Sequence, residues 1–224
     1  MKRLFLYFTI NILCFAFGQE SETKNFSLKN GDLIFQEAYS ENMSKAIKEV
    51  TAGIEGYNFT HVGMVWIDSL NTVYVIDATE PQVRVIPLRE FLYPEKKNRF
   101  PKSVVGRLKE TYQPLIPQAI KEALKQVGKG YDRAFNPNND LYYCSELIYF
   151  AFYKANHNQA VFPLNAMTFK SSNGEYSSYW TEHFRKLNIP IPEGEPGTNP
   201  GAMSQSEVID IVHYFDSNAP AQSR

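Results

Sequence analysis

The chain has 224 residues, and its 23 Lys and Arg side chains nearly balance 24 Asp and Glu, for a formal net charge of −1. A balanced charge without basic clusters argues against nucleic acid as a partner. No internal repeat, low-complexity tract or linker composition interrupts the sequence, and its length suits one domain with a full hydrophobic core.

The N-terminal segment has the pattern of a secretory signal peptide. Two basic residues precede an apolar stretch, which ends in the small-x-small sequence Ala16-Phe17-Gly18. We predict cleavage after Gly18, which leaves residues 19–224 as one exported domain of the periplasm, cell envelope or medium. The stretch is short and contains Asn11, so we expect no stable membrane insertion after cleavage, and a retained signal anchor is the less favoured alternative. Cys14 lacks the preceding small residue expected of a lipoprotein acceptor.

The rest of the sequence mixes strand and helix patterns. Short runs rich in β-formers predict strands at residues 31–36, 60–67, 72–78, 82–87, 103–108 and 208–214. Helical spacing predicts helices over residues 40–50, with Ser40 as N-cap, 114–127, with Gly128 after its end, and 144–155, and one helical turn at 88–92. Most of the sequence after Asn158 reads as irregular. This is an α+β pattern, a mostly antiparallel sheet with helices packed on one side.

Cys144 opens the strongest helical pattern and is the only cysteine outside the predicted signal peptide. A single thiol in a mature exported protein has no intramolecular disulfide partner. At the first turn of a helix, the positive end of the helix dipole favours the nucleophilic thiolate. The apolar stripe of Cys144, Ile148, Ala151 and Ala155 is expected to face the sheet. The alternative is a buried cysteine that packs as a small hydrophobe.

A thiolate nucleophile needs a base, and His61 is the histidine embedded in an apolar strand. It shares one strand face with Gly63, Val65 and Ile67, and the glycine is expected to leave room for a group that approaches the imidazole. A histidine in such a strand can also be an ordinary core residue. His157 follows the end of the helix that starts at Cys144, where we expect a structural role.

The neighbouring strand offers a carboxylate to orient the imidazole. If Ile67 faces Asn71 across a three-residue loop, His61 faces Asp77 directly, at a separation that suits a hydrogen bond. A four-residue loop reverses the parity and makes Glu80 the nearer acid. We favour Asp77, because it ends an uninterrupted apolar strand.

Four segments together carry a family resemblance: residues 60–65 (THVGMV), 75–78 (VIDA), 130–132 (GYD) and 143–147 (YCSEL). They resemble the circularly permuted branch of the NlpC-type papain-like cysteine peptidases, the YiiX/YaeF-like group, of which lecithin-retinol acyltransferase is a distant relative. The histidine strand precedes the cysteine helix, as in the permuted order. The resemblance covers residues 31–155 and implies a permuted papain-like fold, an antiparallel sheet packed against helices with the catalytic cysteine at a helix N-terminus.

The resemblance implies an exported cysteine hydrolase with Cys144 as nucleophile, His61 as base and Asp77 as orienter, although Glu is common at the last position in the family. A thioester intermediate follows, with the oxyanion held by the Cys144 backbone N–H and the Tyr131 hydroxyl. This chemistry needs no cofactor, and the sequence shows no spaced ligand cluster for a metal. Ser145 is expected to hydrogen-bond locally at the helix start, and Glu146 to act as a structural acceptor.

The leading expectation for the substrate is an amide bond in small peptides, above all peptidoglycan peptides, which an exported enzyme meets first. Tyr57, Tyr131, Tyr142 and Tyr143 lie near the motifs in the sequence, and such a groove suits a short polar peptide better than a long acyl chain. The loops 53–57 and 169–179 are expected to shape it. The alternatives are an amidase or acyltransferase for lipid-like or aminoacyl substrates, and a non-catalytic binding module.

Overall fold

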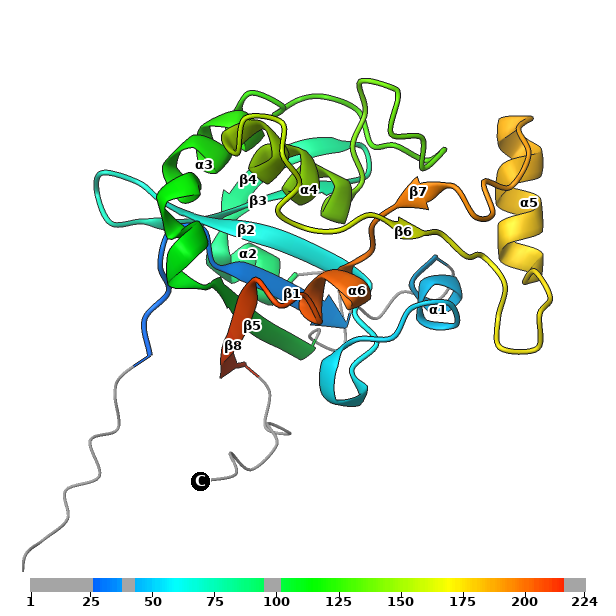
Figure 1. Ribbon diagram of the computed structural model, residues 1–224, viewed down its shortest axis with the longest axis horizontal. Helices are drawn as coiled ribbons and strands as arrows, with labels where there is room; N and C mark the ends of the chain where they lie inside the picture. Colours follow the sequence, from blue (N-terminus) through cyan, green and yellow to red (C-terminus); the bar gives the residue numbers. More distant parts are fainter. Residues whose placement is uncertain (1–25, 38–42, 95–101, 216–224) are drawn as a thin grey trace, which may run out of the picture.

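The computed structural model of the protein describes residues 26–37, 43–94 and 102–215 (Figure 1). The predicted signal peptide (residues 1–18), Cys14 and the expected N-cap Ser40 lie outside these ranges. Among the helices in the described ranges, none has the length and apolar character needed to cross a membrane.

An antiparallel sheet forms the centre of the fold, with strand order β4-β3-β2-β1-β5-β8. Its strands are β1 (Leu33–Glu37), β2 (His61–Ile67), β3 (Val73–Thr79), β4 (Gln82–Pro87), β5 (Lys102–Leu108) and β8 (Ile209–Tyr214). A separate short ribbon pairs β6 (Asn165–Ala166) with β7 (Pro196–Gly197). The predicted antiparallel sheet is confirmed, and the bounds of its strands differ from the predicted ones by at most two residues.

The helices are α1 (Met43–Lys48), α2 (Leu88–Leu92), α3 (Ile116–Leu124), α4 (Cys144–Ala155), α5 (Ser178–Leu187) and α6 (Pro200–Ser204). In Figure 1, α3 and α4 lie side by side over the sheet, and α4 packs on β2 and β3. Helix α5 stands at the far end of the molecule, beside α1.

Alternation along the strands divides the buried side chains between two faces of the sheet. Leu33, Val62 and Ile76 belong to the larger core, together with the buried face of α4. Their neighbours Ile34 and Val75 belong to a second core on the opposite face, which α2 covers. Because both faces are buried, the direction in which each strand residue points is fixed by packing.

Two helix predictions need correction. The predicted helix over residues 114–127 is shorter, because a 3-10 turn (Glu110–Leu115) precedes α3 and includes Pro114. Gly128 has a φ of 90° and turns the chain back toward β4, where its N–H donates to the Val83 carbonyl at 2.9 Å. Helix α1 ends at Lys48, two residues before the end of the predicted range 40–50, whose first three residues lie outside the described ranges.

Helix α5 lies in the region that the sequence pattern predicted to be irregular. Its start has a recognisable signal, since the Ser177 side chain caps the Trp180 N–H. Its end has another, because Asn188 adopts the left-handed conformation at φ 55°. Trp180 and Phe184, four residues apart, bury one helix face in a small third core.

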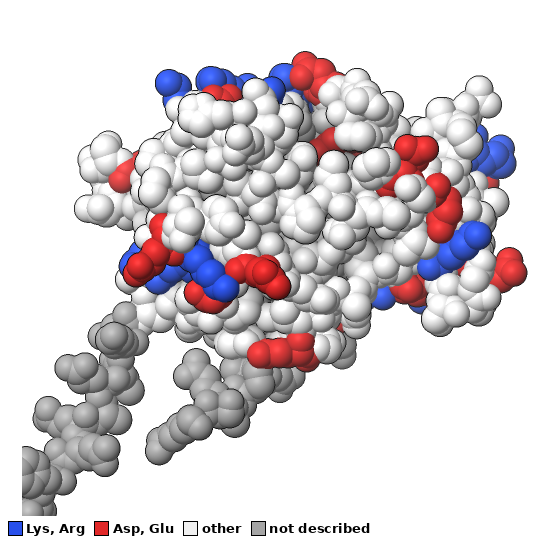
Figure 2. All heavy atoms as spheres, viewed as in Figure 1, with Lys and Arg blue, Asp and Glu red and all other residues white. Residues whose placement is uncertain are grey.

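Charged side chains of both signs are interspersed on the face that Figure 2 shows, mainly toward its margin. Most of the central surface in this view is formed by uncharged residues.

Candidate active site

Cys144 is the first residue of α4, as the helical pattern predicted. Glu146, in the first turn, accepts a hydrogen bond from the Tyr143 N–H at 3.2 Å, which satisfies one of the free donors at the helix start. Burial, with the nearby charge of Asp132, raises the pKa of Glu146 to about 8. The expected role of Glu146 as a structural acceptor is therefore confirmed, and Cys144 begins a helix whose start is capped by this side chain.

His61 is the first residue of β2, directly opposite Gln36 of β1. Its ring packs against Phe91 of α2, with 5.6 Å between ring centroids. The space over Gly63 is filled as well, because a Cβ there would lie 2.4 Å from the Val75 side chain and 3.0 Å from Phe91. The glycine therefore leaves room for a group beside His61, as expected, and that group is the Phe91 ring.

Asp77 lies in β3 and contacts His61 through a hydrogen bond of 2.8 Å between His61 Nε2 and Asp77 Oδ2. The predicted register is wrong by two residues, because Ile67 pairs with Val73 rather than with Asn71. A shift of two keeps the parity, so Asp77 stays on the face that carries His61. Glu80, the alternative acid, instead pairs with Arg133 at 2.6 Å.

Arg84 was not predicted from the sequence, and it faces Asp77 directly from β4. Arg84 Nε donates to Asp77 Oδ1 at 2.9 Å, and Arg84 Nη2 donates to Oδ2 at 3.2 Å. Such a two-point contact fixes the plane of a carboxylate. The alternation of β4 and its pairing with β3 would have identified Arg84, had the register been known.

The electrostatics couple these three groups. Burial disfavours the charged form of His61, but its hydrogen bond with Asp77, its interactions with Cys144 and the charge of Asp77 outweigh this and raise the pKa of His61 to about 10. Burial likewise opposes the charge of Asp77, yet the hydrogen bonds and charges of His61 and Arg84 lower its pKa below the usual range. At neutral pH the imidazolium and the carboxylate are therefore both charged.

Cys144 and His61 meet at the end of the sheet from two different cores. Cys144 belongs to the larger core with α4, whereas His61 packs on Phe91 of the second core. The thiol and the imidazole are near enough to interact, and this interaction helps to raise the pKa of His61. Because His61 Nε2 is occupied by Asp77, the ring nitrogen left for the thiol is Nδ1.

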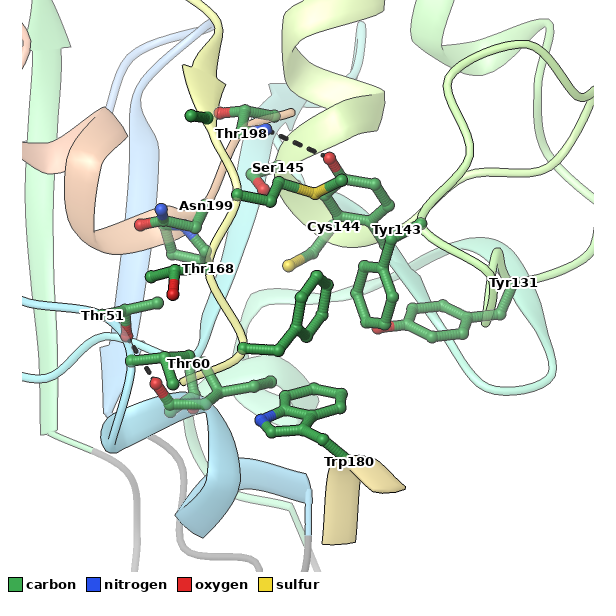
Figure 3. Close-up of a pocket in the computed structure, with 17 residues that line it drawn as sticks. Thr51, Thr60, Tyr131, Tyr143, Cys144, Ser145, Thr168, Trp180, Thr198 and Asn199 are labelled. Carbon is green, nitrogen blue, oxygen red and sulfur yellow. Dashed lines mark hydrogen bonds between the residues drawn. The ribbon is translucent and has the colours of Figure 1, made fainter. Parts of the chain in front are cut away.

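Tyr131 lines the same pocket as the Cys144 thiol. Burial, with the electrostatic interaction with Cys144, raises the pKa of Tyr131 well above its ordinary value, so its hydroxyl stays protonated. A neutral phenol is a hydrogen-bond donor, as the expected oxyanion role requires. In Figure 3 the Tyr131 side chain extends toward the pocket that Cys144 lines.

A pocket of about 100 Å³ adjoins Cys144, whose sulfur points into it (Figure 3). Its walls come from four separate segments: residues 47–60, 131–145, 166–180 and 198–200. Tyr131 and Tyr143 line this pocket as expected, but Tyr57 and Tyr142 do not. Tyr57 stacks on Phe59, with centroids 5.2 Å apart, and Tyr142 packs on Phe150, at 5.1 Å.

Two buried polar groups of this pocket have no hydrogen-bond partner among the described residues: Ser145 Oγ and Trp180 Nε1. The expectation that the Ser145 hydroxyl bonds locally at the helix start is therefore wrong. Ser145 is fully buried and Trp180 is 2 % exposed. Buried polar groups without partners are rare, because each forfeits its hydrogen bonds to water.

Comparison with known proteins identifies the relatives of the chain. Residues 27–213 match the model of a family described as permuted papain-like amidase enzymes, YaeF/YiiX, C92 family. The uncharacterized protein YiiX of Escherichia coli K12 is 28 % identical over 194 residues, which cover 86 % of this chain and 87 % of that protein. The crystal structure of yiiX from Escherichia coli O157:H7 matches with a TM-score of 0.67 at 24 % identity, covering 83 % of this chain and 96 % of that one.

The Escherichia coli O157:H7 protein is described as a metalloprotein. In the described ranges of the present chain, no group of three or more His, Cys, Asp and Glu side chains is arranged to hold a metal ion. The donors among the described residues therefore do not form a set that fits a protein-bound metal.

The family match spans most of the chain, including the histidine strand, the aspartate strand and the cysteine helix. The crystal structure supports the same fold, an antiparallel sheet packed against helices. The chain belongs to the YaeF/YiiX (C92) family of permuted papain-like amidases.

Proposed function

We propose that this protein is an exported cysteine hydrolase that cleaves amide bonds through a thioester intermediate. The observation that carries the proposal is the placement of Cys144 beside His61, whose ring is hydrogen-bonded to Asp77, which Arg84 holds in turn. A nucleophile, a base and an orienting group in contact are what covalent acyl transfer requires.

In the first half of the reaction, the Cys144 thiolate attacks the carbonyl carbon of the amide. The Cys144 backbone N–H and the Tyr131 hydroxyl are the donors proposed for the resulting oxyanion. His61, held as imidazolium by Asp77, passes its proton to the leaving nitrogen. The C–N bond breaks, and the acyl group stays on sulfur as a thioester.

In the second half, neutral His61 takes a proton from a water molecule, which attacks the thioester carbonyl. The C–S bond breaks and releases a carboxylic acid together with the Cys144 thiolate. His61 ends this step as imidazolium, so the ion pair of the resting enzyme is restored.

Export and the cell-wall substrate are further parts of the proposal. The signal-peptide pattern before Gly18 supports export, and an exported amidase meets peptidoglycan peptides first. An amidase or acyl hydrolase for uncharged acyl groups is the second candidate. The observation that favours it is the pocket beside Cys144, whose lining contains no Asp, Glu, Lys, Arg or His.

The test compares the full-length protein with Cys144→Ala on two substrate sets, muropeptide fragments and a panel of simple acyl amides, with products read by mass spectrometry. We expect amide cleavage that depends on Cys144. Alkylation of Cys144 by iodoacetamide near pH 7 should be much faster than that of a free thiol, and slow alkylation with no cleavage of either set would overturn the proposal. Cleavage of acyl amides but not of muropeptides would select the second candidate.

A further inference from the structure

The pocket beside Cys144 has a composition that restricts what it can bind. Its lining is mostly aliphatic and aromatic: Ile47, Val50, Phe135, Ala166, Met167, Phe169, Trp180 and Pro200, next to Tyr131 and Tyr143. The remaining lining residues are uncharged threonines, Ser145, Asn199 and Cys144 itself. A charged group placed here loses hydration without gaining a counter-ion, and this cost is large.

The position of His61 indicates which part of an amide enters this pocket. The leaving nitrogen must lie beside the His61 ring to receive its proton. His61 does not line the pocket, although Cys144 and the neighbouring Thr60 do. The leaving group therefore lies on the side of His61, and the pocket is left for the acyl group that stays on the sulfur.

The volume limits the length of that group. The pocket measures about 100 Å³, whereas a closed apolar cavity of ~150 Å³ holds one benzene ring. A chain of roughly four to six carbons fits this space, and a long fatty chain does not fit inside it.

The two polar groups without partners add a second requirement. The indole N–H of Trp180 donates only, so it needs an acceptor oxygen from a ligand. In Figure 3 the indole nitrogen lies on the side of the ring that faces Thr60, within the pocket lining. The Ser145 hydroxyl, buried behind Cys144, has both a donor and an acceptor to offer.

We infer that the substrate is an amide of a short, uncharged acyl group, held in this pocket by apolar contact and by an acceptor oxygen that takes the Trp180 indole N–H. The inference rests on the proposed amidase function and adds its substrate class. Acyl groups that end in a carboxylate or an ammonium group are excluded from this pocket, so a cell-wall peptide would be cleaved only at a bond whose acyl side is uncharged.

The experiment uses amides of one leaving group, 7-amino-4-methylcoumarin, with four acyl groups. Pentanoyl and glutaryl have the same number of carbons and differ by a terminal carboxylate; 5-aminopentanoyl adds an ammonium group, and decanoyl adds length. We expect kcat/KM for pentanoyl to exceed that for glutaryl and 5-aminopentanoyl by roughly 100-fold or more. Equal rates for pentanoyl and glutaryl, both lost with Cys144→Ala, would overturn the inference and leave the amidase function standing.

The acceptor requirement is tested with 4-oxopentanoyl, which places a ketone oxygen in the same chain. We expect it to react about tenfold faster than pentanoyl, and the advantage to disappear in Trp180→Phe, which keeps a ring and removes the N–H. A matched variant, Met167→Lys, places a cation in the wall and should raise glutaryl turnover relative to pentanoyl. Selectivities that neither variant moves would count against the pocket as the acyl site.

If no amide is cleaved, ligand binding to the Cys144→Ala variant still tests which acyl groups the pocket accepts. Calorimetric titration with N-methylpentanamide and with its glutaric analogue, 5-(methylamino)-5-oxopentanoate, tests the pocket assignment separately from the hydrolase proposal. Preferential binding of the neutral amide supports the pocket assignment even where the hydrolase proposal has failed. Equal or stronger binding of the charged analogue overturns the pocket assignment.

Discussion

The two sides of Cys144 differ in how their polar groups are satisfied. On the side of the sheet, His61, Asp77 and Arg84 lie across three neighbouring strands and hydrogen-bond to one another. On the side of the pocket, Ser145 Oγ and Trp180 Nε1 are buried without partners among the described residues. The reactive side is organised before a substrate arrives, whereas the pocket has hydrogen-bonding capacity left for a ligand.

The largest expected loss of activity follows from removing the Cys144 thiol, which lies between the two sides. Cys144→Ala should lower amide turnover by at least about 10⁴-fold, because the covalent route is lost and only binding and oxyanion contacts remain. Single-turnover kinetics with mass detection of the acyl-enzyme measures this loss. Retained turnover, or an acyl group attached to another residue, would contradict the assignment of Cys144.

Removing the Asp77 carboxylate tests the side of Cys144 on which His61, Asp77 and Arg84 hydrogen-bond to one another. Asp77→Ala should lower kcat/KM by roughly 10²- to 10⁴-fold, less than Cys144→Ala, because the base loses its orientation but the nucleophile remains. The pKa of His61 should fall from about 10, since burial then opposes its charge without the Asp77 bond. A descending limb of the kcat/KM profile that moves to lower pH is the expected sign, and an unchanged profile would refute the orienting role.

Arg84 is expected to act on catalysis indirectly, by holding the Asp77 carboxylate that orients His61. Arg84→Met should lower kcat/KM by about tenfold, the size of effect found for groups that orient a catalytic residue from outside. The pKa of Asp77 rises in this variant, because burial is then opposed by His61 alone. Asp77 is therefore protonated at a higher pH than in the parent protein, and the acid limb of the kcat/KM profile moves to higher pH. Arg84→Lys should recover part of the rate, since it restores the charge without the two-point contact.

The smallest effect concerns stability at the start of α4. The pKa of Glu146 in the folded protein is raised from 4.5 to about 8. The folded state therefore binds more protons than the unfolded state between these values, and its stability falls as the pH rises from about 4.5 toward 8. Glu146→Gln keeps an acceptor for the Tyr143 N–H and removes the charge.

We expect Glu146→Gln to flatten this decline and to raise Tm by about 3 °C or more at pH 9 relative to the parent protein, with little change near pH 5. Thermal unfolding by circular dichroism at a series of pH values measures it. A variant that is less stable than the parent at every pH would show that the carboxylate itself, and not only its acceptor oxygen, stabilises the helix start.

Local patterns in the sequence were sufficient for most elements. Strand alternation predicts which residues share a face within each strand, and helical spacing starts α4 at Cys144, because both depend only on residues close together in the chain. The family resemblance supplied the order of the motifs and the papain-like fold, which the family match confirms. Helix α5 was missed although Ser177 and Asn188 mark its ends.

Only the tertiary structure decided the rest. A register shift of two residues leaves every side chain on the same face, so the hydrophobic pattern could not distinguish Ile67 opposite Asn71 from Ile67 opposite Val73. The contact of Arg84 with Asp77 follows from the pairing of β4 with β3, which the structure provides. The pocket depends on segments more than a hundred residues apart, such as Thr60 and Trp180. Local propensity carries no information about such meetings, because they follow from how the whole chain packs.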